Sequence, residues 1–190
     1  MNTSELNFCL NLHTGIIEGA RLSDCCHFDD RESEEIDLLV IHNISLPPKE
    51  FGGPFIDQFF GGELNPDDHP FFEEIADMRV SSHLLIRRTG EVVQYVPLHK
   101  RAWHAGLSSY QGREKCNDFS IGIELEGADD IPYEEGQYQS LAKLTTLLLK
   151  AYPKMSRDRI AGHSDIAPGR KTDPGPAFDW GHYRSLLART

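Results

Sequence analysis

The sequence has no long apolar run. A helix that crosses a bilayer needs about 20 consecutive apolar residues, and the longest candidates here, Leu38 to Ile41 and Leu147 to Leu149, are far shorter. The N-terminal stretch, residues 1–26, also lacks the basic segment, apolar segment and small-residue cleavage site of a secretory signal. From these two absences we expect a protein that does not cross a membrane and that is cytoplasmic.

Cysteine is scarce and poorly spaced for a metal site or a disulfide. The four cysteines include no CxxC pair, and Cys25 and Cys26 are adjacent, where a disulfide would be strained. Disulfides are also rare in reducing compartments. We therefore expect reduced thiols and no cysteine ligand to zinc.

Positive charge is short as well. The chain has 19 lysines and arginines against 30 aspartates and glutamates, for a formal net charge of -11. Residues 29–37, DDRESEEID, hold six of the acids against the single Arg31. Such a surface repels phosphate backbones, so we expect no nucleic-acid partner. The acidic run itself is expected to be a solvated surface loop.

What the sequence does contain is typical of a globular protein. Hydrophobic residues make up 39% and charged residues 26% of the chain. With no internal repeat and no low-complexity linker, this length favours a single domain over residues 1–190. Nothing in the sequence requires more than a monomer.

Apolar patterning predicts four strands. Residues 36–41, IDLLVI, form a continuous apolar run, as expected of a strand covered on both faces. Residues 83–87 and 91–96 flank Gly90 and predict an antiparallel hairpin. Residues 119–127, FSIGIELEG, alternate between branched aliphatic residues and glycine or glutamate, which is the period of a strand.

Helical spacing predicts two helices that follow these strands. One covers residues 134–152 and is ended by Pro153. A shorter one is expected to begin after Asp179, as its N-cap, and to end near Ala188. Strands with helices around them predict an α/β or α+β fold, with a central mixed β-sheet flanked by helices.

Residues 46–72 form a long segment between the first two predicted strands. Paired glycines, several prolines and many aromatic residues predict an ordered excursion with about one helical turn near Ile56 to Phe60. Loops this long in compact domains are usually lids or binding loops, or else disordered, and the aromatic residues argue against disorder. We expect this segment to form a wall or lid over a ligand.

A second loop, AGHSDIAPGRKTDPG at residues 161–175, carries metal-ligand residue types between prolines and glycines. A catalytic zinc needs about three nitrogen or oxygen ligands and an open position for water. His163 and Asp173 lie close enough in sequence for one loop to supply both, and His42, at the end of the first predicted strand, is the candidate third ligand. Asp165 competes with Asp173, and spacing does not separate them.

Glu124 and Lys171 are candidates for the chemistry beside such a metal. Glu124 lies in a predicted strand, on the face opposite Ile121 and Ile123. Its carboxylate there either reaches solvent or is held in a cleft, and in a dry cleft burial would raise its pKa and suit it to proton transfer. Lys171, two residues before Asp173, would bring a cation to a developing oxyanion.

The segment RAWHAG, residues 101–106, places Trp103 and His104 in a loop of small residues. A tryptophan there either stacks on a sugar ring or packs into the core. His104 is either a further polar contact of the site or a structural hydrogen-bonding residue. The sequence leaves both alternatives open.

Taken together, six segments resemble one known family. They are LLVIHNISLPP, FGGPFIDQFF, DDHPFFEEI, RVSSHLLIRRTGEVVQYV, RAWHAGLSSYQGREKCNDFSIGIELEG and AGHSDIAPGRKTDPGPAFDW. In this order they are similar to the type 2 N-acetylmuramoyl-L-alanine amidases, and in particular to those that recycle bacterial cell-wall fragments. The likeness covers about residues 8 to 187.

The resemblance implies a fold, a cofactor and a set of residue roles. The fold is a mixed sheet flanked by helices, shared with peptidoglycan recognition proteins. The implied cofactor is Zn2+, held by His42, His163 and Asp173, and the implied substrate is a small muropeptide cut between its lactyl group and L-alanine. Glu124 and Lys171 match the catalytic positions. Four residues match expected substrate contacts: Asn43, Arg79, Trp103 and Lys115, the last where related sequences lead us to expect arginine.

Three alternatives remain at this point. Relatives with this fold can recognise peptidoglycan without cutting it when their metal ligands are incomplete. An exported amidase would act on the polymeric wall. A structural zinc would need a fourth protein ligand, for which His104 and Asp165 are candidates.

Overall fold

The computed structural model describes residues 7–32 and 35–189. Its centre is a six-stranded sheet in the order β12-β5-β11-β6-β7-β3, and three small antiparallel pairs lie around it. The strands of the main sheet are β3 (Arg21–Leu22), β5 (Leu38–Ile44), β6 (Leu84–Ile86), β7 (Val92–Gln94), β11 (Ser120–Glu126) and β12 (Ile160–Gly162). The small pairs are β1 (Cys9–Asn11) with β2 (Ile16–Glu18), β4 (Phe28–Asp30) with β8 (Lys100–Ala102), and β9 (Ser109–Tyr110) with β10 (Arg113–Glu114).

Strand directions make the sheet mixed, as the sequence predicted. Strand β11 lies between β5 and β6 and is parallel to both, and β12 is parallel to β5. The predicted hairpin is confirmed, because β6 and β7 pair antiparallel. The strand at β5 is longer than expected and includes His42 and Asn43.

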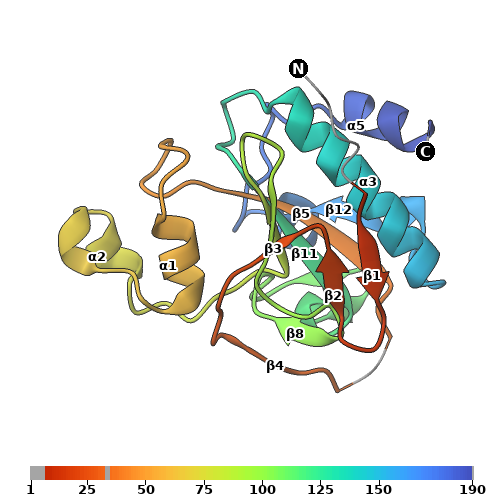
Figure 1. Cartoon of the computed structure of the whole chain (residues 1–190), viewed down its shortest axis with the longest axis horizontal. Coiled ribbons are helices and arrows are strands. Elements are labelled where there is room, and N and C mark those ends of the chain that lie inside the picture. The colour runs from red at the N-terminus through yellow and green to blue at the C-terminus, as the bar shows by residue number, and fades with distance from the viewer. Residues whose placement is uncertain (1–6, 33–34, 190) are drawn as a thin grey trace.

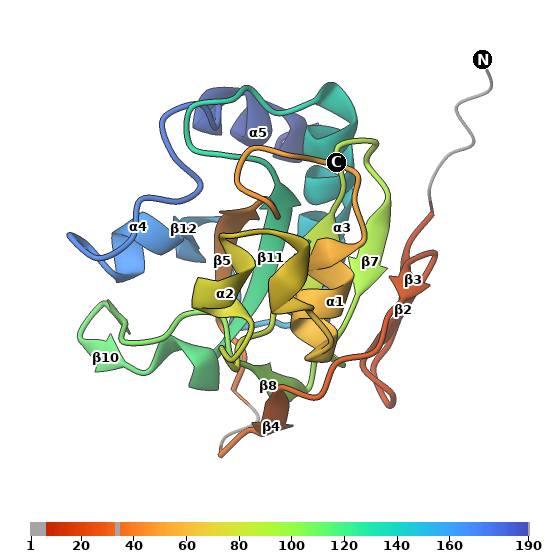
Figure 2. The ribbon, with the colours of Figure 1, turned by 90° about the vertical axis from the view of Figure 1, so that its left-hand side faces the viewer.

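Helices cover both faces of the sheet (Figure 1). On one face lie α3 (Glu135–Ala151) and α5 (Trp180–Leu187). On the other lie α1 (Phe55–Gly61) and α2 (Phe72–Ile75), which face the viewer in Figure 2. None of these helices, among the described residues, is long and apolar enough to cross a membrane.

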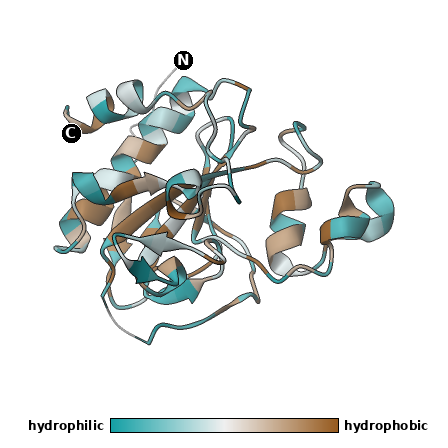
Figure 3. Cartoon of the chain, turned by 180° about the vertical axis from the view of Figure 1, so that it is seen from behind, coloured by the Kyte–Doolittle hydropathy of each residue, from teal (hydrophilic) through white to brown (hydrophobic). Residues whose placement is uncertain are grey.

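The alternation of β11 assigns its two faces. Ile121, Ile123 and Leu125 pack in the cluster that also contains the buried leucines of α3, while Gly122 and Glu124 point to the opposite face. Figure 3 shows the apolar residues gathered along the central strands. The two-residue period of β11 therefore places its branched aliphatic side chains on the α3 side of the sheet and Glu124 on the other side.

Both predicted helices are confirmed, together with their ends. The backbone N–H of Glu134 donates to Gln137 Oε1 at 3.0 Å at the start of α3, and the helix ends before Pro153. At the start of α5 the Asp179 carboxylate accepts from the His182 N–H at 2.8 Å, as an N-cap residue does.

The excursion between β5 and β6 is more ordered than predicted. This excursion extends past the predicted residues 46–72. It contains α1, the short 3₁₀ helix η1 (Pro66–Asp68) and α2, where the sequence predicted about one turn near Ile56 to Phe60. Ile56, Phe60 and Phe72 are buried against the sheet with Leu85 and Val93. Apolar burial therefore holds the segment in place beside the sheet.

In its described residues, 29–32 and 35–37, the acidic run is not the solvated surface loop that the sequence predicted; residues 33 and 34 lie outside the described part of the chain. Asp37 is only 5% exposed and pairs with Arg113 at 2.7 Å and Arg159 at 2.9 Å. Asp29 and Asp30 lie in β4, opposite Arg101 and Lys100 in β8. Basic residues from distant segments, which sequence order does not reveal, neutralise part of the run.

The loop after β12 begins with the short helix α4 (His163–Ile166). Its C-terminal end, at Gly175, packs closely against the backbone of Asp129. Gly175 has a φ of +79°, and a Cβ there would lie 2.2 Å from Asp129 Cα. Ala177 N–H donates to Asp129 O at 2.9 Å in the same contact. The loop that carries two predicted metal ligands is therefore held by a close backbone approach that needs glycine.

We predict that Gly175→Ala destabilises the protein much more than Gly169→Ala. Both glycines have positive φ, but a Cβ at Gly169 meets nothing within 4 Å. Gly169→Ala should cost about 1 to 2 kcal/mol of backbone strain, and Gly175→Ala should lose about 1 to 3 kcal/mol more from overpacking. Urea unfolding of both variants measures this, and equal losses would contradict the close approach.

Candidate metal centre and active site

The carboxyl ends of three neighbouring parallel strands bring the candidate residues together. His42 in β5 and Glu124 in β11 are partners in the sheet register, and His163 directly follows β12. Ligand sites in sheets covered by helices are commonly found at this edge. Residues 42, 124 and 163, far apart in sequence, become neighbours because their strands run in the same direction.

His42, His163 and Asp173 form a compact cluster of ligand atoms. The Nδ1 atoms of the two histidines are 2.9 Å apart, and each lies 3.1 Å from Asp173 Oδ2. Two ligand atoms of a tetrahedral zinc with bonds of about 2.0 to 2.1 Å lie roughly 3.3 Å apart. The three observed separations therefore fit the spacing that such an ion requires.

The charge state of the cluster also suits a cation. Burial lowers the pKa of His42 to about 4, so its imidazole is neutral at neutral pH. Burial acts to raise the pKa of Asp173, but the adjacent His163 and His42 outweigh it and hold that pKa below its ordinary range. Two imidazole nitrogens and one carboxylate oxygen are a donor set that zinc and similar divalent ions accept.

The geometry distinguishes the two aspartates of the loop. Asp165 Oδ2 accepts the Gly162 N–H at 2.7 Å and so caps the first turn of α4. Asp173 instead points its Oδ2 at the two histidines, and its backbone carbonyl accepts the Ser164 N–H at 3.0 Å. The alternative that spacing left open is thus resolved in favour of Asp173 as the member of the cluster.

Glu124 lies in a dry environment beside the cluster. It is 9% exposed, and its Oε2 atom has no hydrogen-bond partner among the described residues. Burial raises the pKa of Glu124 well above the ordinary glutamate value, the negative charge of Asp173 raises it further, and the charge of Lys171 lowers it. The carboxylate is held in a cleft and is not on a solvated strand face.

Glu126, two residues along the same face of β11, has the opposite environment. It is 1% exposed, but its Oε1 accepts from Arg87 Nη1 at 3.1 Å and from the Gly52 N–H at 2.6 Å. Its Oε2 accepts the Arg88 N–H at 3.0 Å. One glutamate of the strand is therefore fully engaged in structure, while the other has an oxygen available for chemistry.

The cleft in front of the cluster has a volume of about 360 Å³ and is lined by both apolar and polar residues. Phe59, Phe71 and Ile75 of the excursion form an apolar wall, while Lys171 and Trp103 line other parts of the cleft. The Trp103 indole N–H donates to Asp29 Oδ1 at 3.0 Å. A ligand with an apolar face and a polar, reactive end suits such a cleft.

The four predicted substrate contacts are distributed unevenly. Asn43 and Trp103 line the cleft. Arg79 is exposed between two residues that line it, and Lys115 lies beside a separate hollow with Arg170. All four stay predictions.

Asp129 is a residue of this region that the sequence did not single out. Its Oδ1 accepts from Asn43 Nδ2 at 2.8 Å, and the same nitrogen donates to Pro174 O at 3.1 Å. These two bonds occupy the amide nitrogen, so the oxygen of Asn43 is the atom available to a ligand. No sequence signal marked Asp129, because the contact joins segments far apart in the chain.

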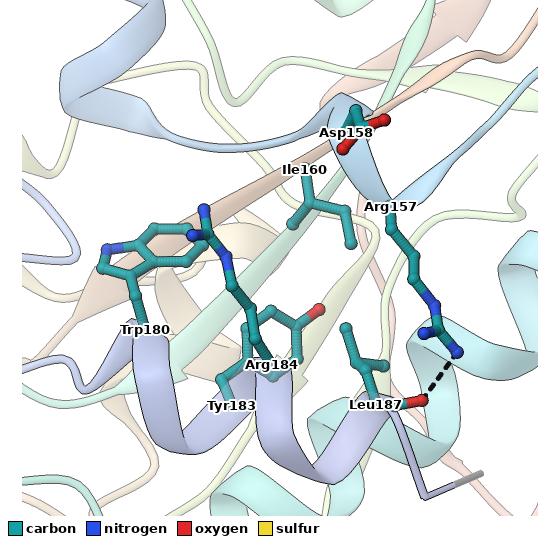
Figure 4. Close-up of a pocket in the computed structure, with 7 residues that line it drawn as sticks. All are labelled: Arg157, Asp158, Ile160, Trp180, Tyr183, Arg184 and Leu187. Atoms are coloured by element: carbon teal, nitrogen blue, oxygen red, sulfur yellow. Dashed lines mark hydrogen bonds between the residues drawn. The ribbon is translucent and has the colours of Figure 1, made fainter.

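Another cavity, of about 400 Å³, lies between β12 and α5 (Figure 4). Arg157, Arg184 and Trp180 line it, and Arg157 Nη2 donates to Leu187 O at 2.8 Å. Its lining residues include a single carboxylate, Asp158, and no histidine. It therefore does not offer a set of metal ligands, and the cleft at the strand ends is the candidate active site.

We predict that Glu124→Gln stabilises the metal-free protein at neutral pH. Because the pKa of Glu124 is raised in the folded state, the unfolded chain ionises first as the pH rises above the ordinary value of 4.5. The wild type then loses free energy of unfolding with rising pH, and the glutamine variant does not. Thermal unfolding in chelator at about pH 4 and about pH 8 measures the difference.

The gain in Tm should be larger at the higher pH, and a gain that is equal at both would contradict a buried, proton-binding Glu124. Glu126→Gln is the matched control, since it lies on the same strand face. It removes a carboxylate partner of Arg87 and should lower Tm.

Comparison with known proteins identifies the family. Residues 32–176 match the sequence model of the family described as N-acetylmuramoyl-L-alanine amidase. The chain is 59% identical over 179 residues to the 1,6-anhydro-N-acetylmuramyl-L-alanine amidase AmpD of Escherichia coli, which covers 94% of this chain and 97% of the relative.

Two solved structures extend the likeness to the fold. A crystal structure of a selenomethionine AmpD derivative is 57% identical with a TM-score of 0.90, covering 94% of this chain and 99% of that one. The amidase AmiD of E. coli, solved with anhydro-N-acetylmuramic acid-L-Ala-D-gamma-Glu-L-Lys, is 27% identical with a TM-score of 0.58, covering 84% of this chain and 65% of that one. Because the family match spans most of the sequence and the fold agrees over nearly its whole length, the chain belongs to the N-acetylmuramoyl-L-alanine amidase family and groups with its AmpD members.

Proposed function

We propose that this chain is a zinc-dependent, cytoplasmic, single-domain amidase of peptidoglycan recycling. Its substrate is a small muropeptide, and it hydrolyses the amide bond between the lactyl group of 1,6-anhydro-N-acetylmuramic acid and L-alanine. The observation that carries the proposal is the meeting of the His42, His163 and Asp173 ligand atoms with the buried carboxylate of Glu124 at the end of one cleft. The names of the similar proteins support the substrate.

His42, His163 and Asp173 are the residues that would hold the zinc ion. The ion is accommodated by the donor types of the three residues, by the neutral imidazole of His42, by the anionic carboxylate of Asp173 and by separations of 2.9 to 3.1 Å. When bound, zinc polarises the scissile carbonyl and lowers the pKa of a water molecule toward ~7.

Glu124 acts as the general base and then as the general acid. Its carboxylate takes the proton of the attacking water and passes it to the nitrogen of the leaving L-alanine. Its raised pKa suits both steps, because a base that is too acidic does not hold the proton and one that is too basic does not release it. The Oε2 atom, which has no hydrogen-bond partner among the described residues, is the oxygen available to accept and donate this proton.

Lys171 supplies a positive charge at the same end of the cleft. Its pairing with the oxygen of the tetrahedral intermediate would stabilise charge that develops only in the transition state. The apolar wall of the excursion excludes water from the bond and holds the sugar and peptide in place. Asn43 lines the cleft, and its amide oxygen, which is not used by the two bonds of its nitrogen, is suited to accept an N–H of the substrate.

The side chains near the cluster favour a catalytic zinc, with three protein ligands and one open position, over a structural zinc with four protein ligands. A structural zinc needs a fourth protein ligand. The two candidates are engaged elsewhere, since His104 Nδ1 bonds to His42 Nε2 and Asp165 caps α4. The intact set of ligands likewise disfavours a recognition module that binds without cutting.

The test of the proposed function is mass spectrometry of 1,6-anhydro-N-acetylmuramyl-tripeptide after incubation with the purified protein. We expect release of free tripeptide, blocked by a zinc chelator and restored by added zinc. An intact substrate with zinc confirmed in the protein would favour a recognition module. Preferential release from polymeric wall would favour an exported enzyme.

Three variants make this test specific to the site. Asp173→Asn should lose zinc and activity, while Asp165→Asn should keep both. Glu124→Gln should keep zinc but lower kcat by about 100-fold or more, the usual worth of a general acid–base residue. Near-normal turnover in Glu124→Gln would remove Glu124 from the mechanism.

A further inference from the structure

A chain of buried hydrogen bonds leads away from the metal cluster on the side opposite the ligand atoms. His42 Nε2 lies 2.9 Å from His104 Nδ1, and His104 Nε2 lies 3.1 Å from Ser120 Oγ. Ser120 Oγ in turn lies 2.6 Å from the backbone carbonyl of Cys116. His42, His104 and Ser120 are exposed by 1%, 8% and 0%, so none of these bonds competes with bulk water.

The last hydrogen bond of the chain determines which atom is the donor in each of the others. The Cys116 carbonyl only accepts, so the single Ser120 hydroxyl proton is donated to it. Ser120 Oγ must then accept from His104 Nε2–H, which leaves a lone pair on His104 Nδ1. That lone pair accepts from His42 Nε2–H, so His42 Nδ1 carries its own lone pair toward the cluster.

His163 reaches the same state by a shorter path. Its Nε2 lies 3.1 Å from the backbone carbonyl of Ala105, which only accepts. Arg170 Nη2, which only donates, is farther away at 3.4 Å and donates to the same carbonyl at 2.7 Å. The shorter contact therefore places the proton on Nε2 of His163 and a lone pair on its Nδ1. The Nδ1 lone pairs of both histidines are therefore available for a metal ion that Asp173 Oδ2 would also bind. For His163 the main chain sets the tautomer, but for His42 it is a side chain, His104.

The surroundings of His104 are built to hold its ring in this position. Asn117 Oδ1 accepts the backbone N–H groups of His104 at 3.1 Å and of Ala105 at 2.8 Å. Gly122 of β11 leaves room for the ring, since a Cβ there would lie 2.5 Å from His104 Cγ. A ring with both nitrogens bonded and its face against a glycine has little freedom to turn.

We propose that His104, oriented by Ser120, is a positioning residue that fixes His42 in the tautomer presenting Nδ1 to the metal. The inference rests on the metal centre of the proposed function and assigns the choice of ligand nitrogen to two residues that are not themselves metal ligands. Partners of this kind, which hold the second nitrogen of a ligating histidine, typically affect metal affinity by 10- to 100-fold.

Zinc affinity is the first readout, measured by competition with a chromophoric chelator. His104→Leu removes the acceptor at nearly constant volume, and Ser120→Ala removes the group that orients it. Both should weaken zinc binding by about 10- to 100-fold. His104→Asn keeps an acceptor oxygen at the distance of Nδ1 from the main chain and should restore most of the affinity.

Ser82→Ala is the matched control. Ser82 is also fully buried, and its hydroxyl also donates to a backbone carbonyl, that of Gly122 at 2.9 Å, but it lies outside the chain of bonds to His42. It should bind zinc as the wild type does. Equal zinc affinity in folded His104→Leu, Ser120→Ala and wild-type protein would overturn the inference.

The tautomer itself is the second readout and needs no variant. Nitrogen NMR of the histidine rings in the zinc-free wild type should show His42 protonated at Nε2 and bare at Nδ1. A His42 proton on Nδ1 would overturn the inference even if the variants fail to fold. A wild type that binds no zinc, but whose His42 tautomer is as expected, would refute the proposed metal centre and leave the positioning role of His104 supported.

Discussion

The structure depends on one constraint, that three electron-pair donors must face one another at a separation of about 3 Å. In the absence of an ion, lone pairs on two imidazole nitrogens and a carboxylate oxygen would repel one another, so a set of ligands made of His42, His163 and Asp173 needs a restraint. The fold supplies the restraint from outside. Parallel strands β5 and β12 fix the two histidines, and the close approach of Gly175 to Asp129 fixes the end of the loop that carries Asp173.

Strand β11 carries the proposed general base and also anchors the excursion that forms the apolar wall of the cleft. Glu124 and Glu126 lie on one face of β11, but only Glu126 is fully paired. Through Arg87 it also reaches the excursion, because Arg87 donates to Gly53 O at 3.0 Å and pairs with Asp57 at 3.1 Å. These contacts connect the apolar wall to the strand that carries the proposed general base. They therefore hold the wall at a fixed position relative to Glu124.

Periodicity in the sequence was enough to predict four strands of the main sheet and the helices α3 and α5, but not the strands β3 and β12. The strands around β5 and β11 and the helices α3 and α5 have strong apolar patterns and clear ends, such as Pro153 and Asp179. The four-residue helix α2 carries too little pattern to be recognised. The burial of Asp37 depends on Arg113 and Arg159, which reach it from distant segments.

The site was less accessible to sequence reasoning than the fold. Residue types and spacing indicated His42 and His163 as metal ligands but did not distinguish Asp165 from Asp173. Only the resemblance to a family favoured Asp173. His104 stayed ambiguous, because its place depends on the absence of a side chain at Gly122 and on Ser120, both contributed by another strand. Contacts of this kind between distant segments leave no recognisable pattern in the sequence.

The most direct test of the central claim is X-ray diffraction from crystals of the purified protein at the zinc absorption edge. The account predicts one anomalous peak, bonded to Nδ1 of His42, Nδ1 of His163 and a carboxylate oxygen of Asp173 at about 2.0 to 2.2 Å, with no fourth protein ligand. A peak bonded through Nε2 of His42, a peak closed by a fourth side chain, or zinc bound elsewhere would contradict it.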